Sequence, residues 1–460
     1  MTSPRRRSSE RLAAALVAAL LGASAASPAS AIDAGTNRTP GAAATTDTLE
    51  AALLQAFERS EAGAIDPLRE ALRAMPDPAI RAVIRMRLAA SRLDLPGVRS
   101  EMRGLTRLGV QPNWRAIARA TEAGAAFACG DYALASLDAG AWLDLPDGTD
   151  PIHTRSDMEQ MRAIAAQLAR TPRQATASNR AGSTRTWRDK ASLLRATVTV
   201  GRVSQEAVLD TGANLSVVTE TTAKRLGLTV MEKADVRSST RAAVPVRIAI
   251  APRLEIAGTS LTNVAFLVLK DADLSIPLPG GYEIPAIIGF PVFRALKQVT
   301  FTTGSLLLGG DRTDLAIPSN LVASGSDLFA LASVNGIAVP LHLDSGASHT
   351  TLAPRFVAEH PGFVAGLERR TVRTGGAGGI TEGSAHVLRD AGVAVGGVTT
   401  SLPAVDVADG APSVTGHYGT LGQDVLRAAA GYTIDFERMT LTLTSADSAP
   451  ARSAGDAATP

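Results

Sequence analysis

Two short segments of the chain place an aspartate at the end of an apolar, strand-like run. Each aspartate is followed by a hydroxyl residue, a glycine and an alanine, in Asp210-Thr211-Gly212-Ala213 and Asp344-Ser345-Gly346-Ala347. The hydroxyl residue and the glycine allow the backbone to turn tightly. Each segment can therefore present a carboxylate at the end of a strand, in a buried cleft.

The residues downstream of the two aspartates also match. An apolar segment that contains a glycine follows each of them, Ala286–Phe293 in the first case and Gly419–Leu426 in the second. Asp210 and Gly289 are 79 positions apart, and Asp344 and Gly422 are 78 positions apart. Two matching segments at matched spacing indicate one unit, repeated at about the size of a small β domain.

On these residues the chain resembles the retropepsin-type aspartic proteases. The closing stretch Gly419–Phe436, followed by Leu441–Leu443, is similar to bacterial members of that family. The resemblance covers about residues 192–444. It implies an all-β region of two tandem retropepsin-like β-barrel lobes, which form a pseudo-twofold aspartic protease.

The resemblance also implies roles for the residues of the two segments. Asp210 and Asp344 would be catalytic. The hydroxyl groups of Thr211 and Ser345 would bond to the backbone of the opposite loop. Gly212 and Gly346 would keep the two carboxylates coplanar, and the apolar segments that end in Gly289 and Gly422 would pack behind the loops.

Peptide hydrolysis without a metal or a covalent intermediate needs a base to activate water and an acid to protonate the scissile carbonyl oxygen. Two carboxylates that share one proton supply both, because like charges a few ångströms apart do not both ionise at low cost. We therefore expect the two units to pack face to face and bring Asp210 and Asp344 together. The covalent tether favours pairing within one chain, so we expect a monomer.

Alanine follows each motif, at Ala213 and Ala347, as in retroviral-type enzymes. Stomach-type enzymes carry a hydroxyl there, which favours the ionised carboxylate. Its absence predicts less depressed pKa values for the pair and optimal activity at mildly acidic or neutral pH.

Family enzymes cover the substrate with a β-hairpin flap from each half. In the second unit we predict the flap tip at Gly375, Gly376, Ala377 and Gly378, about thirty residues after Asp344. The corresponding first-unit segment, Ser238–Pro245, contains no glycine. The second flap is therefore the better candidate for movement. A surface loop is the alternative interpretation.

Composition and motifs exclude several other functions. The chain has 46 Lys and Arg against 44 Asp and Glu, so no basic excess indicates nucleic acid as a partner. The six histidines are scattered, and no metal-site motif is present. We expect no metal and no cofactor. His342 and His349 flank the second aspartate, and structural or surface roles are favoured for both.

The N-terminus resembles a secretory signal. A basic stretch, the apolar run Leu12–Leu21 and the small residues Ala29-Ser30-Ala31 follow one another. The apolar run is too short for a convincing membrane span. We expect a mature protein that begins near Ile32, is periplasmic or secreted, and has no membrane span. The single cysteine, Cys129, offers no disulfide.

The patterns along the chain predict an α region followed by an all-β region. The expected divisions are a signal peptide (1–31), a flexible leader (32–47), a helical region (48–170), a linker (171–190), a first lobe (191–310), a linker (311–326), a second lobe (327–445) and a disordered tail (446–460).

Prolines in the helical region recur every 34 positions, at Pro78, Pro112 and Pro146, and the region weakly resembles tetratricopeptide repeats. An ordinary helical bundle is the alternative.

Two functions remain open from the sequence. One is an exported aspartic endopeptidase with a peptide or protein substrate, in which the helical region docks a protein partner or is a pro-segment. The other is a catalytically inactive scaffold that binds peptides through its lobes and helical repeats.

Overall fold

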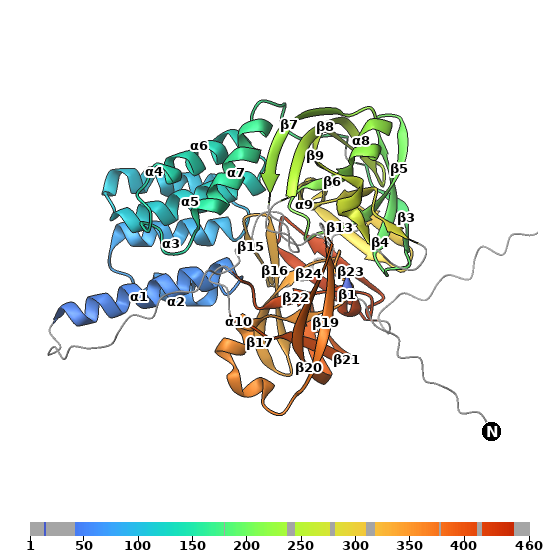
Figure 1. Ribbon diagram of the computed structural model, residues 1–460. Helices are drawn as coiled ribbons and strands as arrows, with labels where there is room; N and C mark the ends of the chain where they lie inside the picture. Colours follow the sequence, from blue (N-terminus) through green and yellow to red (C-terminus); the bar gives the residue numbers. More distant parts are fainter. Residues whose placement is uncertain are drawn as a thin grey trace, which may run out of the picture.

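The computed structural model describes residues 13–14, 42–178, 180–236, 244–276, 281–309, 318–376, 379–411 and 416–445. Most of the expected signal peptide and leader lie outside the described residues, as does the whole of the expected tail. The described chain forms a helical region and two β lobes, which Figure 1 shows as three adjoining bodies.

Seven helices form the first body. They are α1 (Ala42–Glu61), α2 (Asp66–Ala74), α3 (Pro78–Ala90), α4 (Leu95–Leu108), α5 (Pro112–Ala128), α6 (Tyr132–Leu143) and α7 (Arg155–Leu168). Their starts follow from the sequence, because side chains of Asp77, Asp94, Asp131 and Thr154 accept bonds from the first free backbone N–H groups. Two of the recurring prolines open α3 and α5, where a missing N–H costs nothing.

The first lobe contains strands β2 to β14 and three short helices. The strands are β2 (Ala175–Ser178), β3 (Gly182–Arg188), β4 (Leu194–Val200), β5 (Val203–Leu209), β6 (Ser216–Thr219), β7 (Thr229–Val236), β8 (Val244–Ile256), β9 (Thr259–Leu269), β10 (Ser275–Ile276), β11 (Tyr282–Glu283), β12 (Ala286–Ile288), β13 (Gln298–Thr302) and β14 (Ser305–Leu308). The helices are α8 (Glu220–Arg225), η1 (Asp271–Leu274) and α9 (Phe290–Leu296). Strands β4-β5-β12-β6-β9-β8 follow in that order, and β8 pairs back with β4. They close a six-stranded barrel.

The second lobe repeats this plan. Its elements are β15 (Leu321–Ser324), β16 (Asp327–Val334), β17 (Ile337–Leu343), β18 (Thr351–Leu352), α10 (Pro354–Glu359), η2 (Pro361–Val364), β19 (Glu368–Gly376), β20 (Gly379–Val395), β21 (Val398–Ala408), β22 (Gly419–Leu421), α11 (Gln423–Leu426), β23 (Gly431–Asp435) and β24 (Thr440–Thr444). Strands β16-β17-β22-β18-β21-β20 follow in order, and β20 pairs back with β16. The short β1 (Ala13–Ala14) pairs in parallel with β19.

A continuous antiparallel sheet joins the lobes. Strand β13 of the first lobe pairs with β23 of the second, from Gln298 opposite Asp435 to Thr302 opposite Gly431. The order across the junction is β24-β23-β13-β14-β3. Each lobe therefore contributes its last hairpin, and the two lobes are held in a fixed relation.

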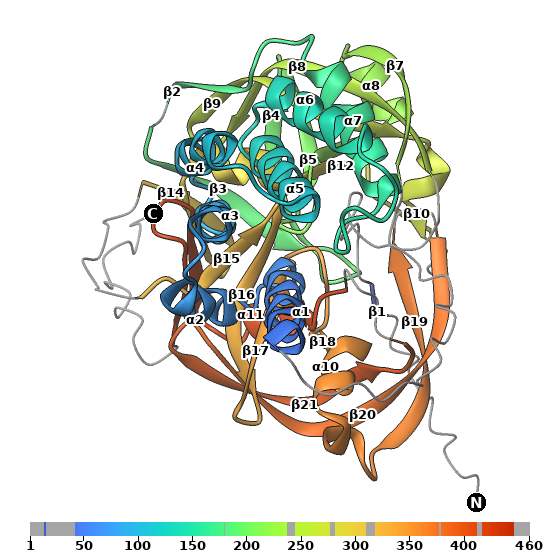
Figure 2. The same ribbon diagram turned by 90° about the vertical axis from the view of Figure 1, so that its left-hand side faces the viewer.

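The helical region packs against both lobes (Figure 2). One apolar cluster joins helices α5 to α7 to first-lobe residues such as Leu193 and Leu215. Another joins helices α1 to α5 to Val322 and Phe329 of the second lobe. Buried Arg87 of α3 donates to the backbone oxygen of Ala323 in β15 at 3.0 Å. The three bodies therefore share buried contacts and form one unit.

The structure differs from the expected linkers at two places. Residues 171–190 contain β2 and β3, and residues 311–326 contain β15. Strand β3 was not predicted because most of its side chains are polar and at least partly exposed, with only Thr186 fully buried. Backbone pairing with β4 and β14 holds this strand in place. Because the strand does not depend on apolar side chains, its sequence shows no alternation of apolar and polar residues.

Candidate active site

Strands β5 and β12 position Asp210. They run in parallel, with Leu209 opposite Ile288, and the backbone N–H of Asp210 donates to the oxygen of Ile288 at 3.0 Å. The N–H of Phe290 then donates to the oxygen of Ala213 at 2.8 Å. The apolar segment therefore packs behind the aspartate loop, as the sequence resemblance implies.

The second lobe holds Asp344 in the same way. Leu343 lies opposite Leu421, the N–H of Asp344 donates to the oxygen of Leu421 at 3.1 Å, and the N–H of Gln423 donates to the oxygen of Ala347 at 2.8 Å. The repeated sequence spacing thus produces two loops with matching backbone bonds.

Close packing explains the glycine that follows each apolar segment. A Cβ atom at Gly289 would lie 2.6 Å from the backbone oxygen of Ala213, and one at Gly422 would lie 2.5 Å from the carbonyl carbon of His349. Any larger residue would push the aspartate loop forward.

The hydroxyl groups of the two motifs bond across to the opposite lobe. Thr211 Oγ1 donates to the oxygen of Leu343 at 3.0 Å and accepts from the N–H of Ser345 at 3.0 Å. Ser345 Oγ donates to the oxygen of Leu209 at 2.9 Å and accepts from the N–H of Thr211 at 2.9 Å. Four reciprocal bonds, all buried, therefore tie the two loops together.

The two aspartates lie side by side at this junction. A Cβ atom at Gly212 would lie 2.8 Å from Asp344 Cγ, and one at Gly346 would lie 2.5 Å from Asp210 Cγ. Each carboxyl group therefore packs directly on the glycine of the other loop. No side chain fits at either glycine without displacing a carboxylate.

Each carboxyl group accepts one bond from its own loop. The N–H of Gly212 donates to Asp210 Oδ1 at 2.9 Å, and that of Gly346 donates to Asp344 Oδ1 at 2.8 Å. The Oδ2 atoms of both are buried without a donor among the described residues. Because each carboxyl group packs against the glycine of the other loop, one proton on the pair supplies a donor between them.

Burial governs the protonation of the pair. Both aspartates are fully buried. Burial, and then the charge of Asp344, raises the pKa of Asp210 well above its usual value. Burial also raises the pKa of Asp344, against the opposing effect of the His342 charge. The pair therefore retains a proton at higher pH than isolated aspartates do.

His342 makes the two halves unequal. It is buried beside Asp344, with Nε2 3.6 Å from Asp327 Oδ1, and its ring stacks on that of His417. Burial lowers the pKa of His342, but Asp327 and Asp344 outweigh burial and the pKa is raised. A protonated His342 favours ionisation of Asp344 over Asp210. Position in the sequence placed His342 near the site, but its partner Asp327 was not predicted.

The residues after the apolar segments differ between the lobes. Gln423 Nε2 donates to the oxygen of Ser345 at 2.8 Å, and Gln423 Oε1 accepts from Arg188 of β3 at 2.8 Å. Phe290 takes the corresponding place in the first lobe and lies in its apolar core. The second loop therefore has a polar support that the first lacks. Arg188 lies in an expected linker, and no motif marked it.

Each lobe carries a long hairpin at the position expected for a flap. In the second lobe β19 and β20 pair as far as Gly376 opposite Gly379, and β20 contacts β10 of the first lobe. Gly375 and Gly376 lie at the end of β19, whereas Ala377 and Gly378 lie outside the described residues.

The first-lobe hairpin differs in its support. Strands β7 and β8 pair up to Val236 opposite Val244, and residues 238–243 of the expected first-flap segment lie outside the described residues. Helix α7 packs against both strands. The helical region thus braces one hairpin and leaves the glycine-rich hairpin without such support from α7.

Among the described residues, no group of three or more His, Cys, Asp or Glu side chains is arranged to hold a metal ion. Within the same part of the chain, no helix is both long and apolar enough to cross a membrane.

Two β barrels that each lend one aspartate to a shared buried pair define an aspartic-protease fold. Two tandem segments of the chain, residues 196–292 and 330–425, match the family model described as Aspartyl protease. Each lobe therefore contains one segment that matches this family model.

A comparison with solved structures finds similarity to a retropepsin-like aspartic protease from Rickettsia conorii. The identity is 18%, the alignment covers 28% of this chain and 93% of that chain, and the TM-score is 0.22. A search of curated proteins found no match. The likeness of the two lobes to this family rests on the two sequence matches.

Proposed function

We propose that the chain is an exported aspartic endopeptidase that hydrolyses peptide bonds through the Asp210/Asp344 pair. The observation that carries the proposal is the reciprocal packing of the two aspartate loops, which brings both carboxyl groups to one buried, proton-sharing centre. A scaffold that only bound peptides would gain nothing from this arrangement, because burying two carboxyl groups is costly.

The two aspartates take different roles in the proposed reaction. Asp344, beside His342, is the ionised member and removes a proton from the attacking water. Asp210 holds the proton and donates it to the scissile carbonyl oxygen, which gives a tetrahedral diol. Asp344 then donates its proton to the amide nitrogen while Asp210 takes a proton from a hydroxyl of the diol. The C–N bond breaks, the amine and the carboxylic acid leave, and the singly protonated pair is restored.

Substrate has to enter between the two hairpins and the pair. We propose that the hairpin β19–β20 moves to admit it, because α7 braces the hairpin β7–β8. Closure then excludes water and strengthens the electrostatic effect of the pair.

The test uses a mixture of synthetic peptides and three full-length proteins: wild type, Asp210→Asn and Asp344→Asn. We expect cleavage by the wild type, inhibition by a statine-type transition-state mimic, and loss of about 10³-fold or more in kcat for both variants. Asp147→Asn, at an exposed position, is the matched control. Full activity in either dyad variant would refute the assignment.

Export has its own test. Expression with the native N-terminus in a Gram-negative host should give periplasmic or secreted protein that begins near Ile32, as read by N-terminal sequencing. A cytoplasmic protein that retains Met1 would contradict the proposal of export.

A further inference from the structure

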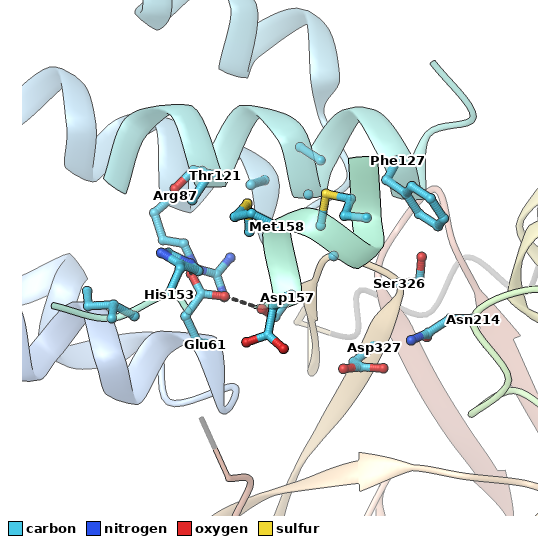
Figure 3. Close-up of a pocket in the computed structure, with 18 residues that line it drawn as sticks. Glu61, Arg87, Thr121, Phe127, His153, Asp157, Met158, Asn214, Ser326 and Asp327 are labelled. Carbon is cyan, nitrogen blue, oxygen red and sulfur yellow. Dashed lines mark hydrogen bonds and ion pairs between the residues drawn. The ribbon is translucent and has the colours of Figure 1, made fainter. Parts of the chain in front are cut away.

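A pocket of about 150 Å³ lies where the helical region meets both lobes (Figure 3). Helices α5 and α7 line one side of it, with Gly124 and Met158 among their residues. The first lobe contributes Asn214, and the second contributes the turn Ser324–Asp327 between β15 and β16. The pocket is thus built by all three bodies.

This pocket shares residues with the surroundings of the aspartate pair. Asn214 is in the same loop as Asp210, four positions further along the chain. Asp327 begins β16, and its Oδ1 lies 3.6 Å from Nε2 of His342, which is two positions before Asp344. A group bound in the pocket would therefore lie beside the site where a substrate is proposed to react.

Three oxygen atoms that line the pocket are buried and receive no hydrogen bond from the part of the chain that the structure describes. They are Asn214 Oδ1, Ser326 Oγ and Asp327 Oδ1. Asn214 is 3% exposed and Ser326 is 7% exposed. Buried polar atoms in native proteins are nearly always paired, so three such acceptors in one pocket indicate a ligand that brings donors.

The positive charges near the pocket already have partners. Arg87 pairs with Glu61 at 3.0 Å, and His153 Nδ1 lies 2.9 Å from Asp150 Oδ2. His342 Nε2 lies 3.6 Å from Asp327 Oδ1, beyond hydrogen-bond distance. Asp327 therefore shares its charge with His342, but its Oδ1 still has the capacity to accept a hydrogen bond from a cationic donor.

One part of the lining is apolar. Phe127, Met158 and Met161 face the pocket together with alanines of α5. Such walls suit an alkyl chain whose end carries the charge, and methionine side chains adapt to its shape. An ammonium group on a carbon stem matches both the acceptors and the walls.

We propose that this pocket binds a protonated primary amine of the peptide substrate, either a lysine side chain or the free N-terminus. The nature of the ligand rests on the proposed peptidase function. The helical region then helps to select substrate, by forming a wall of the site.

The first experiment measures kcat/KM for matched peptides derived from one that the wild type cleaves. One series replaces a lysine near the scissile bond by norleucine, and the other acetylates the N-terminus. In at least one pair of peptides, kcat/KM should be about tenfold or more higher for the peptide that carries the free amine. A tenfold ratio corresponds to about 1.4 kcal/mol. The series that shows the preference identifies the source of the amine.

Variants then locate the preference. Asp327→Asn should reduce the ratio within the pair to about twofold or less, because the charge on the acceptor is lost. Gly124→Leu should do the same from the helical side by filling the pocket, whereas Gly124→Ala should keep the ratio, since its Cβ would lie 3.8 Å from Gly325 Cα. Because each ratio compares two peptides on one variant, changes in folding or basal rate cancel.

A binding experiment separates this inference from the peptidase proposal. Calorimetry with full-length Asp210→Asn and the same peptides needs no hydrolysis. Tighter binding of the amine peptides without any wild-type cleavage would support the pocket and refute the peptidase. Three results would overturn the inference. The first is an equal kcat/KM for both peptides of every pair, and the second is equal binding of the paired peptides. The third is a preference for the amine that remains in both Asp327→Asn and Gly124→Leu.

Discussion

At the residue scale, each aspartate depends on atoms of the opposite lobe. Thr211 and Ser345 exchange four buried bonds, and each carboxyl group packs on the other loop's glycine. The geometry of the pair is therefore set between the lobes, and neither motif is sufficient alone.

Thr211→Val removes two of these bonds while keeping the shape of the side chain. The backbone N–H of Ser345 and oxygen of Leu343 would be left buried and unpaired, which should lower the free energy of unfolding by about 1–3 kcal/mol. Activity should fall at the same time. Denaturant unfolding and peptide hydrolysis measure both effects. Thr211→Ser, which keeps the hydroxyl, should recover most of each, and equal loss in the two variants would contradict the bonding role.

The raised pKa values of the pair predict how stability depends on pH. The folded protein binds protons on Asp210 and Asp344 more tightly than the unfolded chain does. Their contribution to stability is therefore complete below about pH 4, the ordinary pKa of aspartate, and is lost as pH rises through the folded pKa values.

Asp210→Asn should remove part of this pH-dependent loss. Relative to the wild type, its thermal midpoint should be higher at pH 7, and the difference should shrink toward pH 4. Calorimetric scans across that range measure it, with Asp147→Asn as the exposed control. A midpoint difference that is independent of pH would show that the pair is not protonated as described.

At the element scale, the strand pairing between β13 and β23 holds the two barrels in register. Thr300 lies in β13 opposite Thr433, and their hydroxyl groups are 2.9 Å apart. The aspartates belong to different barrels, so this sheet fixes the distance between them together with the loop bonds.

Thr300→Pro should misalign the pair, because proline cannot donate to the ladder. We expect a loss of about 1–3 kcal/mol in the free energy of unfolding and a fall in kcat that is larger than the change in KM. Thr300→Val, which keeps the strand and loses only the hydroxyl, is the control and should remain close to wild type. An unchanged kcat in the proline variant would show that the pairing of β13 with β23 is not needed to align the two aspartates.

The elements that carry the pair could be predicted because their signals are local and repeated. An apolar run, an aspartate, a hydroxyl residue and a glycine indicate the same turn in both lobes. Arg188, Asp327 and Asn214 could not be predicted in this way, because their importance arises from contacts that join distant parts of the chain. Strand β3 is polar and is recognised only through its neighbours.

At the scale of the whole molecule, the helical region is packed as part of the fold. Ion pairs join Arg59 to Glu359 at 3.0 Å and Arg355 to Glu58 at 3.3 Å, across the boundary between α1 and α10. Buried apolar clusters cross to each lobe. These contacts could not be read from the sequence, because the helical pattern shows which face is apolar and does not show what covers it.

Unfolding of the whole chain should therefore be cooperative. We expect a single calorimetric transition for the helical region and both lobes. A chain that begins at residue 171 should be poorly soluble, because the apolar faces of both lobes would be exposed. Two separate transitions, or a stable and active chain without the helices, would contradict this and would favour a removable pro-segment.

The proposed reaction centre needs both lobes, because each lobe supplies one of its two aspartates. Titration of the full-length protein with a statine-type peptide, followed by calorimetry, tests it most directly. We expect one bound molecule per chain, with affinity strongly reduced by Asp210→Asn and by Asp344→Asn alike. Two molecules per chain, or unchanged affinity in either variant, would show that the aspartates do not act as a pair.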